Sequence, residues 1–156
     1  MHTIRLRGPW QLEPVARFEP ESDGTYRATS ENLPPATRAK MPANWADAFG
    51  PGFLGRVRYV RTFQKPTGLE SGGRVFLVVS PPQSEGCILL GGQLLGFVYP
   101  GESAQRFDIT ERLDSHNTVE IFVDHPALDE LRSKVGDPAA LPPGGLVGEV
   151  RLEIEE

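Results

Sequence analysis

Alternation of apolar and polar positions is the strongest structural signal in this chain. The clearest run spans residues 55–63, where Val57, Tyr59 and Phe63 share one face and mostly polar residues occupy the other. Successive side chains of a strand point to opposite faces, so this run predicts a strand with one face in the core. Further predicted strands are residues 4–12, 15–18, 74–80, 107–110, 118–124 and 148–154, and a short one near Tyr26.

Two other patterns predict a tight hairpin and one helix. Gly91 and Gly92 separate the apolar runs 87–90 and 93–97, a spacing typical of a two-residue β-hairpin. A helix is expected over residues 126–135, where proline stands first and leucine and valine recur at intervals of three and four. The polar stretch 19–40 is otherwise interpreted as turn and loop.

Length and composition turn these elements into a fold class. The chain has 156 residues, which suits one domain spanning residues 1–156. Its 17 glycines and 15 prolines are spread along the sequence, as expected for many short strands joined by turns. We therefore predict an all-β fold, an antiparallel β-sandwich with one short helix.

Charge and targeting signals exclude several classes of partner. Sixteen basic residues against 21 acidic residues give a formal net charge of −5, which attracts neither nucleic acid nor an anionic membrane. The N-terminus lacks the apolar stretch of a signal peptide, and no run is long enough to span a membrane. The expected location is the cytoplasm. The single cysteine, Cys87, lies in an apolar run and is expected to act as a small buried hydrophobic residue.

Common catalytic and cofactor motifs are missing from the sequence. No serine stands in a Gly-x-Ser-x-Gly elbow, and His2, His116 and His125 have no metal-ligand spacing. The glycine pattern at residues 50–55 precedes a strand, so it is interpreted as a turn and not as a phosphate loop. No dense Asp/Asn loop argues for a structural calcium ion. We expect no metal site and no cofactor.

Several short motifs occur together in a recognisable order. Read in sequence, they resemble the N-terminal sugar-binding domain of family 2 glycoside hydrolases, which include β-galactosidases, β-glucuronidases and β-mannosidases. This resemblance implies a galactose-binding-like jelly roll, which in those enzymes precedes an immunoglobulin-like domain and a catalytic barrel. The motifs are Pro42-Ala-Asn-Trp45, Gly55-Arg-Val-Arg-Tyr-Val-Arg-Thr-Phe63, Val75-Phe-Leu-Val78, Leu95-Gly96, Phe107-Asp-Ile-Thr110, Asn117-Thr-Val-Glu-Ile121 and Gly144-Gly-Leu-Val-Gly-Glu-Val-Arg-Leu152.

Three departures from the family limit what the resemblance implies. The hairpin turn is Gly91-Gly92, where the family usually has Asn-Gly. The proline-rich loop 125–145 has a predicted helix of its own, so the family's loop contacts are not carried over. The sequence ends at Glu156, before the barrel that carries the two catalytic carboxylates of the family, and we expect no glycosidase activity.

Sugar binding requires an aromatic surface beside fixed polar groups. Trp45 and Tyr99 are the loop-placed aromatic candidates, although Trp45 also suits core packing and Tyr99 also suits capping of the sandwich. Asp124 and His125, at the end of a strand, are the polar candidates. Their alternative role is to cap the helix that follows.

Two further charged residues have predicted structural roles. Arg61 falls in phase with the apolar residues of its strand and is expected to point inward beside Phe63. A buried arginine requires an acidic partner, so we expect a structural ion pair, with a ligand clamp as the alternative. Asp108 is expected to bind turn amides.

The sequence favours a non-catalytic carbohydrate-binding or accessory module that acts beside a glycoside hydrolase. The alternative is a module for protein interaction or self-association on the same sandwich, with sugar affinity lost. An uncharacterised enzyme is a third reading. The expected partners are a carbohydrate, a protein partner or a second copy of the chain, because fold alone does not establish sugar affinity.

Overall fold

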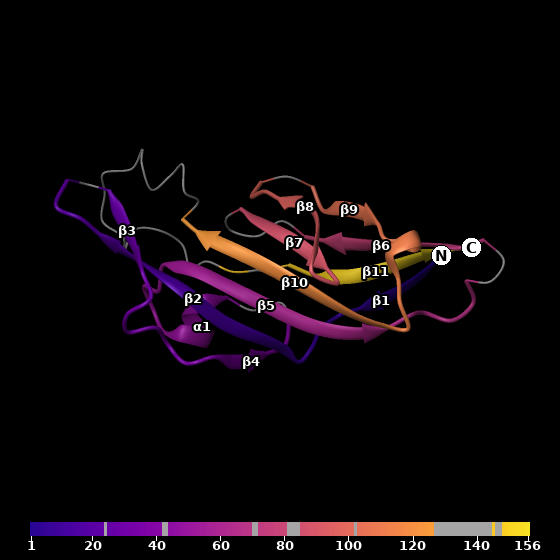
Figure 1. The fold of residues 1–156 in the computed structure, drawn as a ribbon, viewed down its shortest axis with the longest axis horizontal. Helices are drawn as coiled ribbons and strands as arrows, with labels where there is room; N and C mark the ends of the chain where they lie inside the picture. Colours follow the sequence, from indigo (N-terminus) through magenta and orange to yellow (C-terminus); the bar gives the residue numbers. More distant parts are fainter. Residues whose placement is uncertain are drawn as a thin grey trace.

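The computed structural model describes residues 1–23, 25–41, 44–69, 72–80, 85–101, 103–126, 145 and 148–156. The strands form two antiparallel sheets (Figure 1). The smaller sheet has four strands, in the order β1 (His2–Arg5), β11 (Val150–Glu155), β6 (Arg74–Val79) and β9 (Gln105–Asp108).

The larger sheet has seven strands. In spatial order these are β3 (Tyr26–Thr29), β2 (Trp10–Pro20), β5 (Gly55–Gln64), β10 (His116–His125), β7 (Gly86–Leu90) and β8 (Gln93–Val98), with β4 (Thr37–Ala39) also paired to β2. The described part of the chain adds one α-helix, α1 (Trp45–Phe49), and one 3-10 turn, η1 (Thr110–Arg112). The predicted all-β antiparallel sandwich is confirmed, and the arrangement is consistent with a jelly roll.

The alternating sequence patterns produce the two central strands of the larger sheet. Along β5 and β10, buried residues alternate with partly exposed ones, and Tyr59 stands opposite Ile121 on the buried face. Val57 and Val123, two residues away on each strand, also stand opposite each other on the buried face. Each burial of an aliphatic or aromatic side chain contributes roughly 1.5–3 kcal/mol, so these inward positions hold the sheet against its partner.

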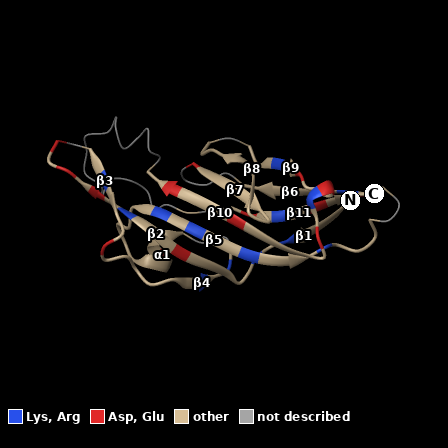
Figure 2. Cartoon of the chain, viewed as in Figure 1, with Lys and Arg blue, Asp and Glu red and all other residues tan. Residues whose placement is uncertain are grey.

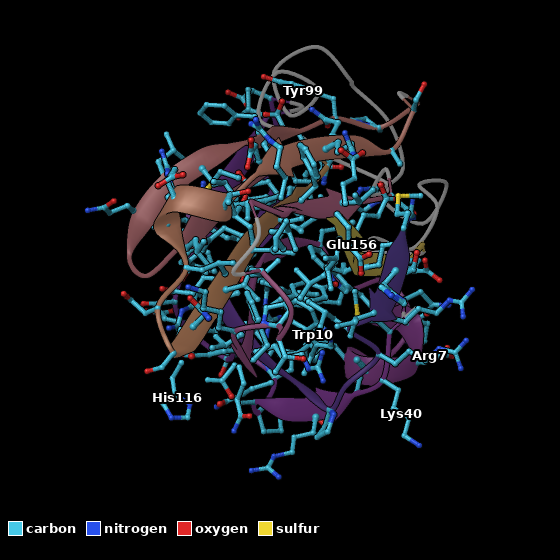
Figure 3. All side chains as sticks on the ribbon, turned by 90° about the vertical axis from the view of Figure 1, so that its right-hand side faces the viewer. Arg7, Trp10, Lys40, Tyr99, His116 and Glu156 are labelled. Carbon is cyan, nitrogen blue, oxygen red and sulfur yellow. The ribbon has the colours of Figure 1, made fainter. Side chains whose placement is uncertain are left out.

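The core lies between the two sheets. Figure 3 looks along the sandwich and shows Trp10 inside, whereas Tyr99 and His116 lie at the periphery. The indole N–H of Trp10 donates to the carbonyl of Leu6 at 2.6 Å, and this bond satisfies the only polar atom of the buried ring. The largest fully buried side chains are Trp10, Trp45, Tyr59, Leu12, Leu77, Ile88, Ile109, Ile121 and Leu152.

The helix of the structure is not at the predicted position. Helix α1 begins after Asn44, whose side-chain oxygen accepts a hydrogen bond from the backbone N–H of Asp47 at 2.9 Å, and it ends at Gly50, which has a φ of 92°. Its five residues are too few to show helical periodicity, so the sequence pattern wrongly places Trp45 in a loop. The helix predicted over residues 126–135 lies outside the described residues, except for its first residue.

The N-terminal region contains more strand than the sequence predicted. The two early runs belong largely to one continuous strand, β2, whose pairing with β5 shifts register between Pro14 and Ala16. Strand β3 confirms the short strand expected near Tyr26. Strand β4 lies in the stretch 19–40, which the sequence predicts to be mainly turn and loop. The sequence does not reveal this short strand because its extended form depends on tertiary pairing with β2.

The predicted hairpin is confirmed as β7 and β8. Gly91 and Gly92 both have positive φ, 59° and 81°, as a two-residue hairpin turn requires. Strand β8 lies at the edge of the larger sheet, where two of its carbonyls bind side chains. Gln105 Nε2 donates to the carbonyl of Phe97 at 2.7 Å, and Arg112 donates to that of Leu94 at 3.2 Å. These contacts occupy edge groups that could otherwise pair with another strand.

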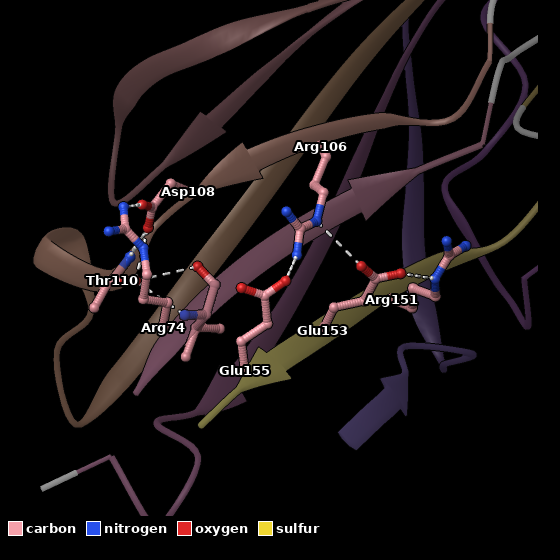
Figure 4. A network of polar contacts seen from close by, with 8 residues as sticks. Arg74, Arg106, Asp108, Thr110, Arg151, Glu153 and Glu155 are labelled. Atoms are coloured by element: carbon pink, nitrogen blue, oxygen red, sulfur yellow. Dashed lines mark hydrogen bonds and ion pairs between the residues drawn. The ribbon is translucent and has the colours of Figure 1, made fainter. Parts of the chain in front are cut away.

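Charged side chains cover the outer face of the smaller sheet (Figure 4). Arg151 pairs with Glu153 at 2.9 Å, and Arg106 pairs with both Glu153 and Glu155 while its guanidinium lies 3.5 Å from the centre of the Phe76 ring. This arrangement shields the apolar part of the face with paired charges. The surface therefore has few unpaired groups to offer a ligand.

Asp108, at the end of β9, fulfils its predicted role. Its Oδ1 accepts hydrogen bonds from the hydroxyl of Thr110 at 2.6 Å and from the backbone N–H of the same residue at 3.0 Å, and its Oδ2 pairs with Arg74. The bonds from Thr110, followed by Arg74, lower the pKa of Asp108 from 3.8 to about 2.

This lowered pKa predicts a specific loss of stability in acid. The contribution of Asp108 is complete above the unfolded pKa of 3.8 and is lost as the pH falls towards the folded pKa of about 2. The free energy of unfolding of the wild type should therefore exceed that of Asp108→Asn above pH 4, and the difference should shrink between pH 4 and pH 2. Urea unfolding at a series of pH values measures it. A carboxyl NMR titration of Asp108 with a midpoint at or above 3.8 would contradict the assignment.

Candidate functional site

A groove on the outer face of the larger sheet is the strongest candidate for a functional site. It has a volume of about 630 Å³ and crosses strands β2, β5, β10, β7 and β8. Its floor consists of outward side chains, because they alternate with the buried residues of the same strands. The side chains that define it are Arg56, Cys87, Phe97, Tyr99, Phe122 and Asp124.

An ion pair between neighbouring strands fixes the polar part of the groove. Arg56 on β5 stands opposite Asp124 on β10, and its Nε and Nη2 donate to the two carboxylate oxygens at 2.6 and 2.9 Å. The Asp124 side chain is only 13% exposed, whereas that of Arg56 is 41% exposed. The hydrogen bonds from Arg56 to Asp124 raise the pKa of the guanidinium, so the arginine stays charged. Such a two-point pair holds both groups in one orientation.

Two exposed aromatic rings border this ion pair. Phe97 is 50% exposed and Tyr99 is 44% exposed, both beyond what an ordinary core residue would show. One side chain holds their backbone, because Gln105 donates to the carbonyl of Phe97 and accepts from the N–H of Tyr99 at 2.9 Å. Phe122 adds a third ring from β10. The groove therefore places exposed apolar surface beside the fixed Arg56–Asp124 pair.

A second ion-pair cluster lies next to the groove on the same face. Arg58 donates to Glu120 at 2.7 Å and to Glu13 at 3.2 Å, which joins β5 to β10 and β2. Figure 2 shows these charged positions in a row along the central strands. Arg56 and Arg58, the two outward arginines in the first half of β5, therefore both have carboxylate partners.

The structure brings together only two of the four predicted ligand residues. Tyr99 and Asp124 line the groove, as described above. Trp45 and His125 lie in the interior, 1% and 2% exposed, and their rings meet edge to face with centroids 6.0 Å apart. Trp45 therefore adopts its alternative role in packing. His125 points to the opposite face of β10 from Asp124, away from the groove.

The alternative roles of Asp124 and His125 as helix caps concern the helix predicted over residues 126–135, which lies outside the described residues except for residue 126. The described partner of the Asp124 carboxylate is Arg56. The sequence does not reveal the pair of Asp124 with Arg56, because the two residues are 68 positions apart.

Arg61 lies partly inside the sandwich, as predicted. Among the residues that the structure describes, no carboxylate lies within ion-pair distance of its guanidinium, and its Nη1 is buried without a hydrogen-bond partner. Burial lowers the pKa of Arg61. Arg61 stands opposite the buried Val119 on β10, so its side chain shares the inward face of the sheet. The structural ion pair and the ligand clamp both stay predictions for Arg61.

Cys87, expected to be a buried residue, is a free and only partly buried cysteine that lines the groove. Burial is the largest cause that raises the pKa of Cys87, so its thiol stays protonated at neutral pH and is a poor nucleophile. No group of three metal-ligating side chains occurs among the described residues. Within the same ranges, no helix has the length and apolar character needed to span a membrane.

Sequence reasoning missed most of the groove. Arg56 appeared only as a polar position of an alternating strand, and Phe97 and Phe122 appeared as ordinary strand residues. Opposite charges at outward positions of two strands, Arg56 and Arg58 against Asp124 and Glu120, were the available signal. That signal becomes specific only once the register of β5 and β10 is known.

Comparison with known proteins adds information at the level of the fold. No protein-family model matches the sequence, and no curated protein matches it. Among solved structures, it is similar to an FMN-binding β-glucuronidase from Facaelibacterium prausnitzii L2-6, with a TM-score of 0.72 and 24% identity over 98% of this chain and 22% of that one. A β-glucuronidase from Bifidobacterium dentium gives a TM-score of 0.70 and 20% identity over 99% and 30% of the two chains.

A β-D-mannosidase from Dictyoglomus thermophilum is also similar, with a TM-score of 0.68 and 14% identity over 98% of this chain and 22% of that one. The chain thus spans less than a third of the length of each of these enzymes. At such low identities the likeness establishes a shared fold. The chain has the fold of one part of these larger glycosidases.

Proposed function

We propose that this chain is a non-catalytic carbohydrate-binding or accessory module that acts beside a glycoside hydrolase and binds sugar in the groove. The observation that carries the proposal is the meeting of exposed Phe97 and Tyr99 with the Arg56–Asp124 ion pair. Tyr99 and Asp124 are the proposed ligand residues from the sequence, joined now by Phe97 and Arg56.

The physical basis is the two-sided chemistry of a pyranose. Its C–H groups form an apolar face that packs on an aromatic ring, and its hydroxyls require fixed hydrogen-bond partners. Phe97 and Tyr99 supply the rings, while the partly exposed side chain of Arg56 supplies donors. Asp124 holds the guanidinium of Arg56, and Gln105 holds the backbone that carries the two rings, which reduces the ordering entropy lost on binding.

The comparisons support the proposal at the level of fold. The similar solved structures are glycosidases. Each alignment includes almost all of this chain but less than a third of the glycosidase chain. A partner enzyme with a separate catalytic domain would complete such an assembly. We propose that this chain alone does not hydrolyse glycosides. An assay with aryl glycosides tests this part of the proposal.

The Tyr99→Ala variant tests the role of the groove. We expect loss of the ring to weaken sugar affinity about five- to tenfold, because aromatic packing contributes on the order of 1 kcal/mol beyond the area it buries. NMR titration of the labelled protein with galactose, mannose and short oligosaccharides measures the affinity. The matched control is Leu94→Ala, which removes another exposed apolar side chain, one of β8 that is not among the groove residues. Equal affinities for both variants would refute the proposed site.

The alternative is a module for protein interaction or self-association. One observation favours it: β8 exposes Leu94 and Phe97 and carries no charged residue, and Tyr99 follows directly. Apolar surface of this kind also suits a protein partner or a second copy of the chain. Light scattering discriminates the two functions. Two results together would favour the alternative. The protein would form a stable dimer that Leu94→Ala dissociates, and its NMR signals would not shift at millimolar sugar.

A further inference from the structure

The floor of the groove runs across the strands of the larger sheet. Its polar half is one row of paired residues, in which Ala16 of β2 stands opposite Arg56 of β5, and Arg56 stands opposite Asp124 of β10. All three line the groove, together with Val15 at the β2 end. Facing residues of paired strands lie on the same side of a sheet, so this row forms a continuous surface from β2 to β10.

The aromatic half of the floor continues from β10 to β8. Phe122 lies two residues before Asp124 and therefore on the same side of β10. It stands opposite Cys87 of β7, which in turn stands opposite Phe97 of β8. These three residues also line the groove. Because both rows include β10, the floor is unbroken across five strands.

This floor is longer than one sugar residue. Neighbouring strands of a sheet lie about 4.8 Å apart, so the four steps from β2 to β8 cover about 19 Å. Single bonds of about 1.5 Å give each pyranose residue a length of roughly 5 Å along a glycan chain. The groove volume of about 630 Å³ agrees with this length, because sites of roughly 300–1,000 Å³ hold drug-sized ligands, which are larger than one hexose.

The two ends of the floor offer different contacts to successive residues of a glycan chain. At the β8 end, Phe97 presents a half-exposed ring to the apolar face of a pyranose. Arg56 and Asp124 present polar groups nearer the other end, and Val15 adds apolar surface there. Because Val15 and Phe97 are separated by the width of the five strands, one hexose packed on Phe97 does not reach Val15.

Resting on the proposed function, we infer that the groove binds a linear oligosaccharide segment of about three sugar residues, which lies across the strands from Phe97 towards Val15. A single hexose fills only part of this floor. Each further residue adds contacts with side chains that the sheet already holds in place, so affinity should rise with chain length until the floor is filled.

A series of ligands of increasing length tests the inference. NMR titration of the labelled protein with β-1,4-linked galacto-, manno- and gluco-oligosaccharides of one to four residues measures each affinity. In at least one series we expect a rise of about tenfold from the monosaccharide to the trisaccharide, the size of one hydrogen bond to a charged group, and little change from the trisaccharide to the tetrasaccharide.

The same titrations separate failure of the inference from failure of the proposed function. A trisaccharide has three residues that can each occupy a single-residue site, so a rise of about threefold or less is statistical. Such a small rise in every series would overturn the inference and leave the proposed function standing. Failure of every ligand to bind would overturn both.

Two matched variants test whether the chain extends to the β2 end. Val15→Ala removes two methyl groups there and should weaken trisaccharide binding about two- to fourfold more than monosaccharide binding. The control is Val60→Ala, the same substitution at a partly exposed position of β5 that is not among the groove residues. It should affect both sugars equally. A native-like amide spectrum confirms folding of each variant. An equal effect on both sugars in folded Val15→Ala would contradict the extended position of the chain.

Discussion

Replacing Trp45 with alanine should lower the free energy of unfolding by about 3–5 kcal/mol, as expected for deletion of a large buried aromatic ring. The ring is 1% exposed and packs against Phe53 and His125 at centroid distances of 5.5 and 6.0 Å. Its indole N–H donates to the hydroxyl of Tyr59 at 2.7 Å. Trp45 therefore joins α1 to strands β5 and β10 in the centre of the fold.

Trp45→Phe separates the ring from the hydrogen bond. This variant keeps most of the apolar volume and loses the indole donor, so a smaller loss of about 1–2 kcal/mol is expected. Denaturant unfolding followed by far-UV circular dichroism measures both values. Tyr99→Ala is the surface control and should change stability by less than about 0.5 kcal/mol.

A loss below about 1 kcal/mol for Trp45→Ala would show that the ring is not in the core. The Trp45→Phe variant also distinguishes core packing from ligand contact as the role of this residue. If Trp45 serves packing, sugar affinity at the groove should persist in the folded fraction of a Trp45→Phe protein. A loss of sugar affinity in that variant without a loss of stability would indicate that Trp45 contributes to sugar binding.

Gly55→Ala should produce the second large effect. A Cβ at this position would lie 2.1 Å from the carbonyl oxygen of Ala16, and backbone cannot rotate away as a side chain can. Because Gly55 stands opposite Arg17 just beyond the register shift of β2, relief requires separation of β2 from β5. We expect a loss of about 3 kcal/mol, at the upper end for overpacking.

The consequences should extend to the groove. Gly55 precedes Arg56, and Ala16 lines the groove, so separation of the two strands moves one of its walls. The control is Gly68→Ala, which meets no atom within 4 Å and changes only a residue with φ of 85°. That variant should cost about 1–2 kcal/mol through backbone strain and leave the groove amide signals in place. Unchanged groove signals and full stability in Gly55→Ala would contradict the strand pairing.

Much of the fold could be predicted from the sequence because period-two alternation is a local signal. The inward residues of β5, β10 and β11 follow directly from the pattern, and the pair Gly91-Gly92 marks the hairpin. Helix α1 could not be predicted in this way, since five residues show no periodicity and only the Asn44 cap marks its start. Strand β4 escaped notice because its extended form depends on pairing with β2.

The groove required tertiary information. Tyr99 was identifiable as an aromatic residue in a glycine-proline loop, whereas the partner of Asp124 depended on the register between β5 and β10. Trp45 illustrates the opposite case: a tryptophan in a short polar segment suggested a ligand contact, and packing placed it beside His125 in the core. Arg61 followed the alternation inward, but alternation carries no information on which groups surround it.

The central claim, that sugar packs on the rings of Phe97 and Tyr99 beside the Arg56–Asp124 pair, is tested most directly by intermolecular NOEs. Isotope-filtered spectra of the labelled protein with a bound neutral glycoside report which protein protons lie close to the sugar. The account predicts NOEs from sugar C–H groups to the ring protons of Phe97 and Tyr99. Binding with NOEs only to residues outside the groove, or no binding at millimolar sugar by a well-folded protein, would contradict it.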